Sequence, residues 1–195
     1  MKTFKDNFKY VVEYDDEVEG EEEEEYDPNW RDTPDQTEGK KRIANFREYY
    51  QIKDADRLIT SKDEKISFRD SPPQVEGRKP KGLWYSCGSE WIDWLETEMP
   101  QWTGKHFFSL EIHEDKMLMI NTDEKFELFQ KEYGVAGEFD RRSIEGIDWS
   151  RVGAEYSGIE ICPRMGDTSG WYYGWDVASG CVWKRDAVKD VKRIM

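Results

Sequence analysis

Several short segments of this chain alternate apolar and polar side chains, which is the pattern of a half-buried β-strand. Residues 106–112 are an example, because Phe108, Leu110 and Ile112 fall on one side of an extended chain. The same alternation, or a short aromatic or apolar run, predicts further strands over residues 65–69, 82–86, 117–120, 159–161, 172–175 and 181–183. We therefore expect more strands than helices.

Helical spacing of apolar residues is limited to short stretches. Residues 42–50 bring Ile43, Phe46 and Tyr50 onto one face of a helix. Further short helices are predicted after Ser89, over 121–133 with Asn121 and Glu124 as a capping box, over 148–156 with Asp148 as the cap, and at the C-terminus around Val188, Val191 and Ile194. The mixture predicts an α+β domain with a small mixed or antiparallel sheet and short flanking helices.

Charge divides the chain into an arm and a domain. Residues 1–40 contain 15 Asp or Glu and 5 Lys or Arg, so they carry −10 of the net charge of −14. We expect residues 1–40 to form an acidic, flexible arm and residues 41–195 to form a single α+β domain, because an acidic run cannot bury apolar surface. The arm either keeps the protein in solution or docks on a basic partner.

Composition also limits the partners and the location. The acidity disfavours nucleic acid, which needs clustered Lys and Arg to displace counterions. The sequence has no run of 18 apolar residues and no apolar signal-peptide core, so we expect no membrane association. Cys87, Cys162 and Cys181 are dispersed, without a close pair or metal-ligand spacing. These features favour a reducing, cytoplasmic location (the host cytoplasm for a viral protein), with unpaired thiols and no metal.

Tryptophan is concentrated in the second half of the chain. Eight of the nine tryptophans lie between residues 84 and 183, among Gly, Ser and isolated carboxylates. A core built only for stability is made more simply from aliphatic residues, because a buried indole N–H needs an acceptor. Aromatic residues beside small and acidic ones suit a cleft with a stacking wall and a polar anchor. The pattern predicts a binding or catalytic cleft for a nucleotide or other small molecule.

Two carboxylates are candidates for chemistry in such a cleft. Glu160 stands between Ile159 and Ile161 in a predicted strand, so it points away from the face of the isoleucines, either into a site or into solvent. Asp176 follows Trp175, and it either forms a turn or lies against aromatic rings that raise its pKa. A carboxylate in this setting can stabilise positive charge on a sugar carbon during glycosyl cleavage.

Other polar residues are candidates for binding. Ser86 ends the 82–86 strand, where it either caps the following helix or faces a ligand. Lys79, Lys81 and Arg69 either contact a phosphate group or remain solvated. The motifs of a P-loop, a zinc protease helix and a nucleophile elbow are absent from the sequence.

The strand Gly82-Leu-Trp-Tyr-Ser86, followed directly by a helix with Trp91 and Trp94, resembles the second strand and helix of ADP-ribosyltransferase-like folds. The order of the segments 107–120, 126–133 and 158–161 is compatible with that fold. The peptides at 79–84, 156–161 and 175–183 also resemble uncharacterised proteins of large viruses and phages.

The resemblance to ADP-ribosyltransferases implies NAD as the cofactor, cleavage of its nicotinamide–ribose bond, and a protein acceptor or partner. The catalytic acid of the family would be Glu160 or Asp176, and the Arg or His of its first strand would be Arg69. The residues expected to bind NAD are Arg69, Lys81, Trp84, Tyr85, Ser86 and Trp175. The chain departs from the family's pattern, because the sequence shows no clear triad of Arg, His or Tyr residues.

Two other functions are compatible with the same residues. The first is a non-catalytic viral or phage accessory module that binds its ligand through the tryptophan-rich cleft. The second places the tryptophans in the core and assigns the function to the acidic arm.

Overall fold

The computed structural model describes residues 34–137, 143–166 and 170–195 of the chain. The acidic run at residues 15–25, and with it the expected flexible arm, lies outside the described residues. Residues 34–40 belong to the first turns of helix α1 (Pro34–Tyr49), which begins earlier than the apolar spacing predicts. The expected boundary after residue 40 therefore falls inside a helix.

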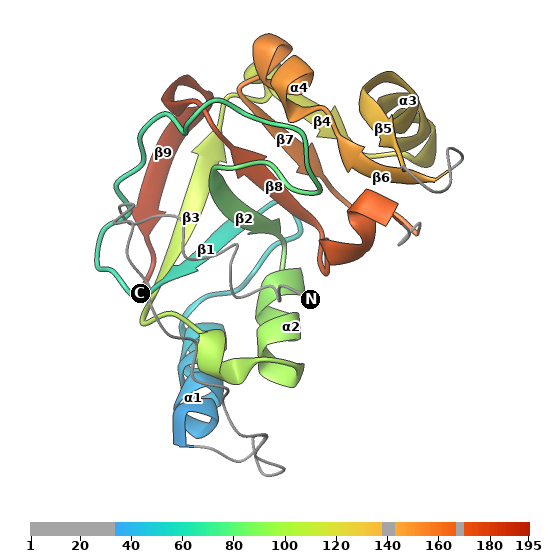
Figure 1. Cartoon of the computed structure of the whole chain (residues 1–195). Helices are drawn as coiled ribbons and strands as arrows, with labels where there is room; N and C mark the ends of the chain where they lie inside the picture. The colour runs from blue at the N-terminus through green and yellow to red at the C-terminus, as the bar shows by residue number, and fades with distance from the viewer. Residues whose placement is uncertain (1–33, 138–142, 167–169) are drawn as a thin grey trace, which may run out of the picture.

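The described part of the chain is α+β, with a curled and mostly antiparallel sheet (Figure 1). The order of the seven strands is β4–β7–β8–β2–β1–β3–β9, and only the pair β4–β7 is parallel. The strands are β1 (Arg57–Ser61), β2 (Leu83–Cys87), β3 (His106–Ile112), β4 (Met117–Ile120), β7 (Gly158–Ile161), β8 (Ser179–Val182) and β9 (Val188–Arg193).

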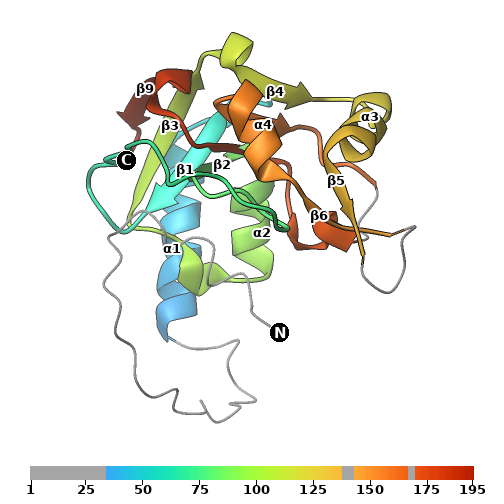
Figure 2. The same ribbon diagram turned by 45° about the horizontal axis from the view of Figure 1, so that its top comes forward.

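The helices cover two ends of this sheet. Helix α1 and helix α2 (Glu90–Thr97) lie together at the end near β1 and β2, whereas α3 (Asp123–Tyr133) and α4 (Trp149–Glu155) lie at the opposite end, as Figures 1 and 2 both show. A short hairpin of β5 (Gly134–Ala136) and β6 (Ile144–Ile147) follows α3. Single 3-10 turns span Pro100–Trp102, Glu114–Lys116, Gly170–Gly174 and Arg185–Ala187.

Side chains are buried on both faces of the main sheet. Because side chains alternate along a strand, Leu83 and Tyr85 of β2 point to one face, here called the inner face, and Trp84 and Ser86 point to the other, the outer face. The inner-face core contains Ile59, Leu83, Tyr85, Phe108, Leu110, Met117, Val182 and Val188. The outer face is covered by two further clusters, one including α1 and α2 and the other including α3, α4 and most of the tryptophans.

Most of the predicted elements are present. The strands expected over 82–86, 106–112, 117–120, 159–161 and 181–183 correspond to β2, β3, β4, β7 and β8. The helices expected around 42–50, after Ser89, over 121–133 and over 148–156 are also confirmed. Asp148 caps α4 as predicted, whereas the cap of α3 is Thr122, one residue after Asn121.

Three predicted elements are wrong for physical reasons. Residues 188–193 form strand β9 instead of a helix, because they pair with β3 at the edge of the sheet. Residues 65–69 form no strand, and their alternation reflects the packing of Ile66 and Phe68 against the inner-face core. Residues 172–175 fall in and just after a 3-10 turn that buries Trp171 and Tyr172. The β5–β6 hairpin was not predicted.

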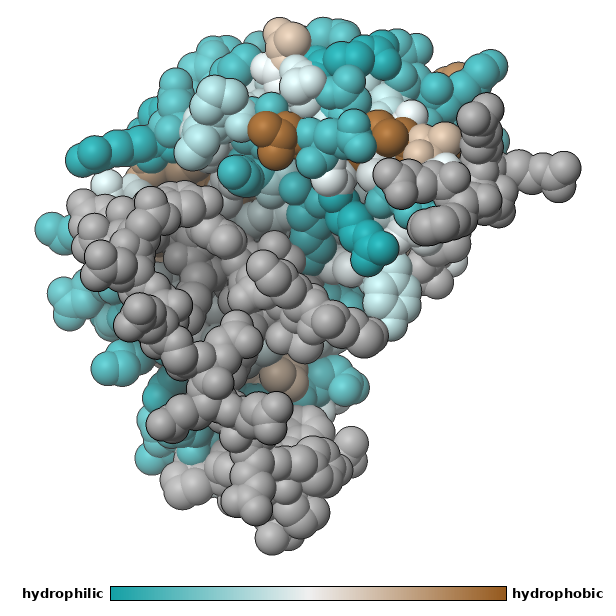
Figure 3. All heavy atoms as spheres, in the orientation of Figure 1, coloured by the Kyte–Doolittle hydropathy of each residue, from teal (hydrophilic) through white to brown (hydrophobic). Residues whose placement is uncertain are grey.

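The face drawn in Figure 3 is largely polar over its described atoms. In the face drawn in Figure 3 apolar residues are scattered among hydrophilic ones, without a broad apolar patch on its described atoms. In the described ranges, none of the helices is long and apolar enough to cross a bilayer.

Gly180 of β8 is required by the packing of the inner face. A methyl group at this position would lie 2.2 Å from Cζ of Tyr85, whose ring is 2% exposed and so cannot swing out. We expect Gly180→Ala to lower the free energy of unfolding by about 1–3 kcal/mol through overpacking. Gly166→Ala is the matched control, because no atom lies within 4 Å of its added carbon. Equal stability of the two variants in urea titrations would contradict this packing.

Candidate functional site

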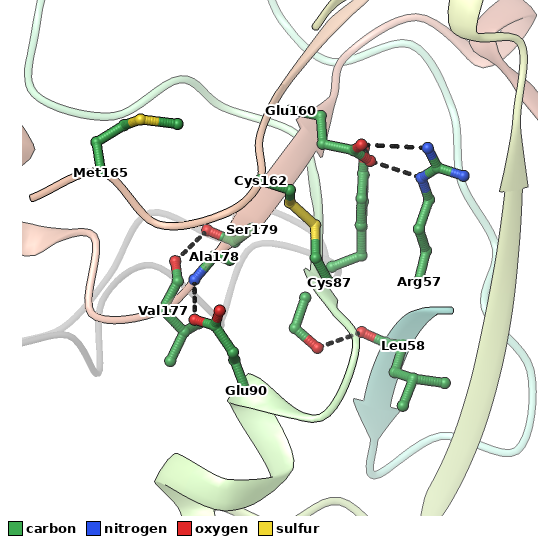
Figure 4. The surroundings of a disulfide bond; sticks show 12 residues. Arg57, Leu58, Cys87, Glu90, Glu160, Cys162, Met165, Val177, Ala178 and Ser179 are labelled. Atoms are coloured by element: carbon green, nitrogen blue, oxygen red, sulfur yellow. Dashed lines mark hydrogen bonds and ion pairs between the residues drawn. A yellow bond between two sulfur atoms is a disulfide. The ribbon is translucent and has the colours of Figure 1, made fainter. Parts of the chain in front are cut away.

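A carboxylate, a guanidinium and a phenol from three strands meet on the inner face of the sheet. Arg57 of β1 donates from Nε to Oε2 of Glu160 at 2.5 Å and from Nη2 to Oε1 at 3.1 Å, as Figure 4 shows. The hydroxyl of Tyr85 donates to Oε2 of Glu160 at 2.8 Å. Glu160 is 6% exposed, so its carboxylate lies inside the domain. Both carboxylate oxygens accept hydrogen bonds from Arg57, and Oε2 also accepts one from Tyr85.

The strand register brings these residues together. Tyr85 of β2 pairs with Gly180 of β8, and Gly180 pairs with Glu160 of β7. The glycine has no side chain, so the phenol ring lies across β8 and its hydroxyl reaches the carboxylate one strand further on. Glu160 points away from the two flanking isoleucines as the sequence predicts, but into the protein and not into solvent.

Burial and charge act against each other in this cluster. Burial lowers the pKa of Arg57, but its hydrogen bonds and charge interactions with Glu160 and Glu114 outweigh burial and raise the pKa above its usual value. Burial, followed by the negative charge of Glu160, raises the pKa of Tyr85 well above 10. At neutral pH the phenol is therefore a proton donor, and Arg57 is a fixed positive charge. Nη2 of Arg57 also contacts the exposed Glu114 at 2.7 Å.

A disulfide bond lies beside the carboxylate. Cys87 at the end of β2 is bonded to Cys162 just after β7, with their Cα atoms 6.4 Å apart (Figure 4). The expectation of three unpaired thiols was wrong, because residues 75 positions apart in the sequence are adjacent across the sheet. Only Cys181 is a free thiol among the described residues. The two sulfurs and a Glu160 oxygen lie within 4.8 Å of one another, but disulfide sulfurs are not thiolate ligands and Arg57 occupies the carboxylate.

A cleft opens on the outer face where β1 and β2 separate. These strands pair only at Arg57 with Cys87 and at Leu58 with Ser86, after which β1 continues beside β3. The cleft is narrow, with a cavity volume of about 20 Å³, enough for about one water molecule. It is lined by Leu58, Ile59, Thr60, Lys79, Trp84, Tyr85, Ser86, Trp91, Trp175, Asp176, Val177 and Ser179.

The segment after Trp175 forms one wall of this cleft and is held at both ends. Nε of Arg164 donates to the carbonyl oxygen of Trp175 at 2.8 Å. The backbone N–H of Ala178 donates to the carboxylate of Glu90, in the first turn of α2, at 2.7 Å. Trp175 packs edge-on against Trp84, with ring centroids 4.9 Å apart. The wall is therefore positioned before any ligand binds.

Lys79 and Asp176 supply the charges of the cleft. The ammonium of Lys79 lies over the Trp84 ring, 5.4 Å from its centroid. Burial lowers the pKa of Lys79 to about 8, against the opposing effect of Asp176. Burial also raises the pKa of Asp176, while the charges of Lys79 and Arg164 lower it. A part-buried amine of lowered pKa next to a carboxylate is a common property of functional sites.

The structure separates the sequence-predicted residues into three groups. Trp84, Tyr85, Ser86, Trp175 and Asp176 all line the outer-face cleft. The side chain of Tyr85, however, points to the inner face, and Glu160 is not among the lining residues. The two candidate acids therefore lie on opposite faces of the sheet.

Arg69 and Lys81 form the third group, which belongs neither to the outer-face cleft nor to the inner-face cluster. Both are exposed, and Lys81 uses its backbone N–H and carbonyl to hold the side chain of Gln74, at 2.9 and 2.8 Å. The residue that sequence reasoning missed is Arg57. Its signal was a single cation at the start of the apolar run Leu58-Ile-Thr60, but nothing in the sequence indicates that this strand lies near Glu160.

The Tyr85 hydroxyl stabilises the buried carboxylate. We expect Tyr85→Phe to lower the free energy of unfolding by about 1–3 kcal/mol, because Glu160 loses a hydrogen bond that water cannot replace. Tyr173→Phe is the control, because that side chain is 63% exposed. Denaturant titrations of both variants test this, and an unchanged midpoint for Tyr85→Phe would contradict the assigned hydrogen bond.

The lowered pKa of Lys79 predicts a dependence of stability on pH. Between about 8, its pKa in the folded protein, and its ordinary 10.5, the unfolded chain binds more protons than the folded one. The contribution of Lys79 to the free energy of unfolding therefore rises as the pH increases from 8 to 10.5. The same contribution is lost as the pH falls back through this interval to 8. The free energy of unfolding of the wild type should rise relative to Lys79→Met from pH 8 to 10.5. A flat difference between the wild type and Lys79→Met across this interval would contradict the lowered pKa.

Known proteins give no independent indication of the role of either site. No family model, no curated protein and no solved structure matches this chain. A functional assignment therefore depends on the side-chain geometry of the inner-face cluster and the outer-face cleft.

Proposed function

We propose that the protein is an ADP-ribosyltransferase-like enzyme that cleaves the bond between nicotinamide and ribose in NAD, with Glu160 as the essential carboxylate. The observation that carries the proposal is the convergence of Arg57, Tyr85 and Glu160. The resembled family uses an Arg or His of its first strand, an aromatic second strand and an acid on a later strand. Arg57 on β1, Tyr85 on β2 and Glu160 on β7 supply these groups in that order.

The chemistry needs a fixed negative charge near the ribose. When the bond from C1′ of the ribose to the nicotinamide nitrogen breaks, the electron pair leaves with nicotinamide and the sugar becomes oxocarbenium-like. A preorganised carboxylate stabilises this positive charge more than it stabilises the substrate. Water or an acceptor nucleophile then bonds to C1′ and loses its proton. In this scheme Arg57 and Tyr85 orient the Glu160 carboxylate.

Access to the carboxylate is limited to one side. The side chain of Glu160 is 8% exposed and that of Arg57 is 18% exposed, whereas Glu114 on the same guanidinium is 61% exposed. A substrate would therefore approach from the Arg57 and Glu114 side, where the guanidinium can also contact an anionic group. The disulfide bond between Cys87 and Cys162 lies beside the same carboxylate.

The second candidate function is a non-catalytic binding module that uses the outer-face cleft. It is favoured by the hydrogen bonds of Glu160, which already accepts from two side chains as a structural buried ion pair would. On this alternative the inner-face cluster only stabilises the fold, and NAD is not cleaved.

Release of nicotinamide from NAD tests the proposal. The wild type should release nicotinamide, and Glu160→Gln should slow the release by about 100-fold or more, because the stabilising charge is lost while the shape is kept. Glu111→Gln is the matched control, because this carboxylate pairs with Lys189 on the exposed surface. Binding of NAD should persist in Glu160→Gln.

Arg57→Lys keeps the positive charge but loses the two-point contact with the carboxylate, so we expect both slower release and a lower melting temperature. Release is therefore compared at a temperature at which circular dichroism shows the variant to be folded. Absence of nicotinamide release by the wild type would contradict the proposed activity. Loss of release in Asp176→Asn but not in Glu160→Gln would contradict the choice of acid.

A further inference from the structure

The disulfide bond of this protein joins two strands that are not neighbours in the sheet. Strands β2 and β7 both pair with β8, which lies between them. Neighbouring strands are about 4.8 Å apart, so strands on either side of a third are normally about 9–10 Å apart. The Cα atoms of Cys87 and Cys162, one residue beyond the last pairs with β8, are only 6.4 Å apart. The ends of β2 and β7 therefore converge where the disulfide joins them.

The same two strands also carry the hydrogen bond between Tyr85 and Glu160. Tyr85 lies two residues before Cys87, and its hydroxyl donates to the Glu160 carboxylate at 2.8 Å. Glu160 in turn lies two residues before Cys162. Because side chains alternate along a strand, all four side chains point to the inner face. The disulfide and the hydrogen bond are therefore consecutive connections between β2 and β7.

The disulfide is close to the carboxylate and partly open to solvent. Both sulfurs lie within 4.8 Å of a Glu160 oxygen, and Figure 4 shows the two cysteine side chains meeting beside this carboxylate. Cys87 and Cys162 are both partly exposed, whereas Cys181 is fully buried. Burial raises the pKa of the Cys181 thiol well above its usual value, so Cys181 remains a protonated thiol. Thiol–disulfide exchange needs a thiolate that reaches a disulfide sulfur, and a small thiol from solution meets this condition.

Opening the disulfide changes the spacing of the two strand ends. Bonded sulfurs are about 2.05 Å apart, whereas two unbonded atoms of this size are about 3.5–4 Å apart at van der Waals contact. A hydrogen bond between two oxygens weakens beyond about 3.0 Å. Separation of the cysteines by more than 1 Å, about the difference between bond and contact, is therefore enough to lengthen the neighbouring Tyr85–Glu160 hydrogen bond past its useful range.

We propose that the Cys87–Cys162 disulfide is a reversible redox site for small thiols, and that its reduction weakens the Tyr85–Glu160 hydrogen bond and slows the reaction at Glu160. The effect on NAD cleavage rests on the proposed function. The exchange at the disulfide and the change at Tyr85 do not depend on it.

The exchange consumes two thiols for each disulfide. The thiolate of a small thiol attacks one cysteine sulfur, the S–S bond breaks, and the electron pair leaves on the sulfur of the other cysteine, which takes a proton from water. A second thiolate then attacks the small-thiol sulfur of the mixed disulfide and releases the first cysteine, which is also protonated. The protein gains two electrons, and the two small thiols are oxidised to one disulfide.

Alkylation of the full chain tests the exchange. The oxidised protein is incubated with an excess of reduced glutathione, and free thiols are alkylated with iodoacetamide and located by mass spectrometry. Cys87 and Cys162 should become alkylated in the folded protein only after reduction, and oxidised glutathione should restore their bond. Cys181 should be alkylated only in denaturant, because it is buried. Resistance of the folded protein to glutathione would overturn the proposed redox site.

NMR of the tyrosine rings tests the connection to the carboxylate. In protein labelled with ¹³C at tyrosine, the ring signal of Tyr85, assigned with Tyr85→Phe, should move on reduction. The signal of Tyr49, which is 69% exposed on α1, should not. Release of nicotinamide should fall by about tenfold or more on reduction, because a hydrogen bond to a charged group is weakened, and should recover on reoxidation.

Two cysteine variants separate the disulfide from other effects of the thiol. The double variant Cys87→Ala with Cys162→Ala should show the moved Tyr85 signal and the slower release without any thiol, and glutathione should change neither. Cys181→Ala is the matched control, because it removes a cysteine outside the disulfide and should keep the full response to glutathione.

The remaining outcomes distinguish this inference from the proposed function. Measurements are made at a temperature at which circular dichroism shows the oxidised protein to be folded. Loss of the folded spectrum on reduction would overturn the inference, because the disulfide would then only stabilise the fold. An unmoved Tyr85 signal, or equal nicotinamide release in the two states, would overturn the control of Glu160. A moved Tyr85 signal without nicotinamide release in either state would support the redox site and contradict the proposed function alone.

Discussion

The buried carboxylate of Glu160 imposes the strictest requirement on this fold. An ionised carboxylate inside a protein is tolerated only when it is paired and hydrogen-bonded, and removing one partner typically costs about 3–5 kcal/mol. Its partners come from β1 and β2, which are separated from Glu160 by 103 and 75 residues in the sequence. The register of four strands must therefore be correct at once. Gly180 is part of this requirement, because any side chain there would displace the Tyr85 ring.

Strand β2 connects the two candidate sites. Its two-residue period sends Tyr85 to the carboxylate on the inner face and Trp84 and Ser86 to the cleft on the outer face. A change in the position of β2 would alter both sites, but single side-chain substitutions should affect one at a time. The disulfide between Cys87 and Cys162 fixes the end of the same strand next to β7. One short strand therefore carries residues of both candidate sites.

The tryptophans serve two different purposes. Trp149, Trp171 and Trp183 lie in the core beside α3 and α4, and their indole N–H groups are satisfied by acceptors within the protein. This part of the tryptophan pattern supports the fold. Trp84 and Trp175 are at the boundary between that core and the outer-face cleft. Abundance of tryptophan in the sequence therefore does not distinguish residues that line the cleft from residues of the core.

The sequence by itself determined the local elements and part of the cleft. Alternation and helical spacing report which side of an element is buried, so β2, β3, β7, α3 and the cap at Asp148 were predictable. The dense peptides around Trp84 and Trp175 likewise indicated residues that do line one cleft. Local patterns failed at residues 188–193, where pairing with β3 decided the conformation.

Only the tertiary structure decided which distant residues meet. Arg57 rather than Arg69 reaches Glu160, Cys87 bonds to Cys162, and Asp176 lies on the opposite face from Glu160. Each of these facts depends on strand order and register, which bring together segments up to 103 residues apart. Side-chain periodicity along one strand contains no information about which strand lies next to it. That choice is made by the packing of the whole sheet, and in this protein it also places the buried charge.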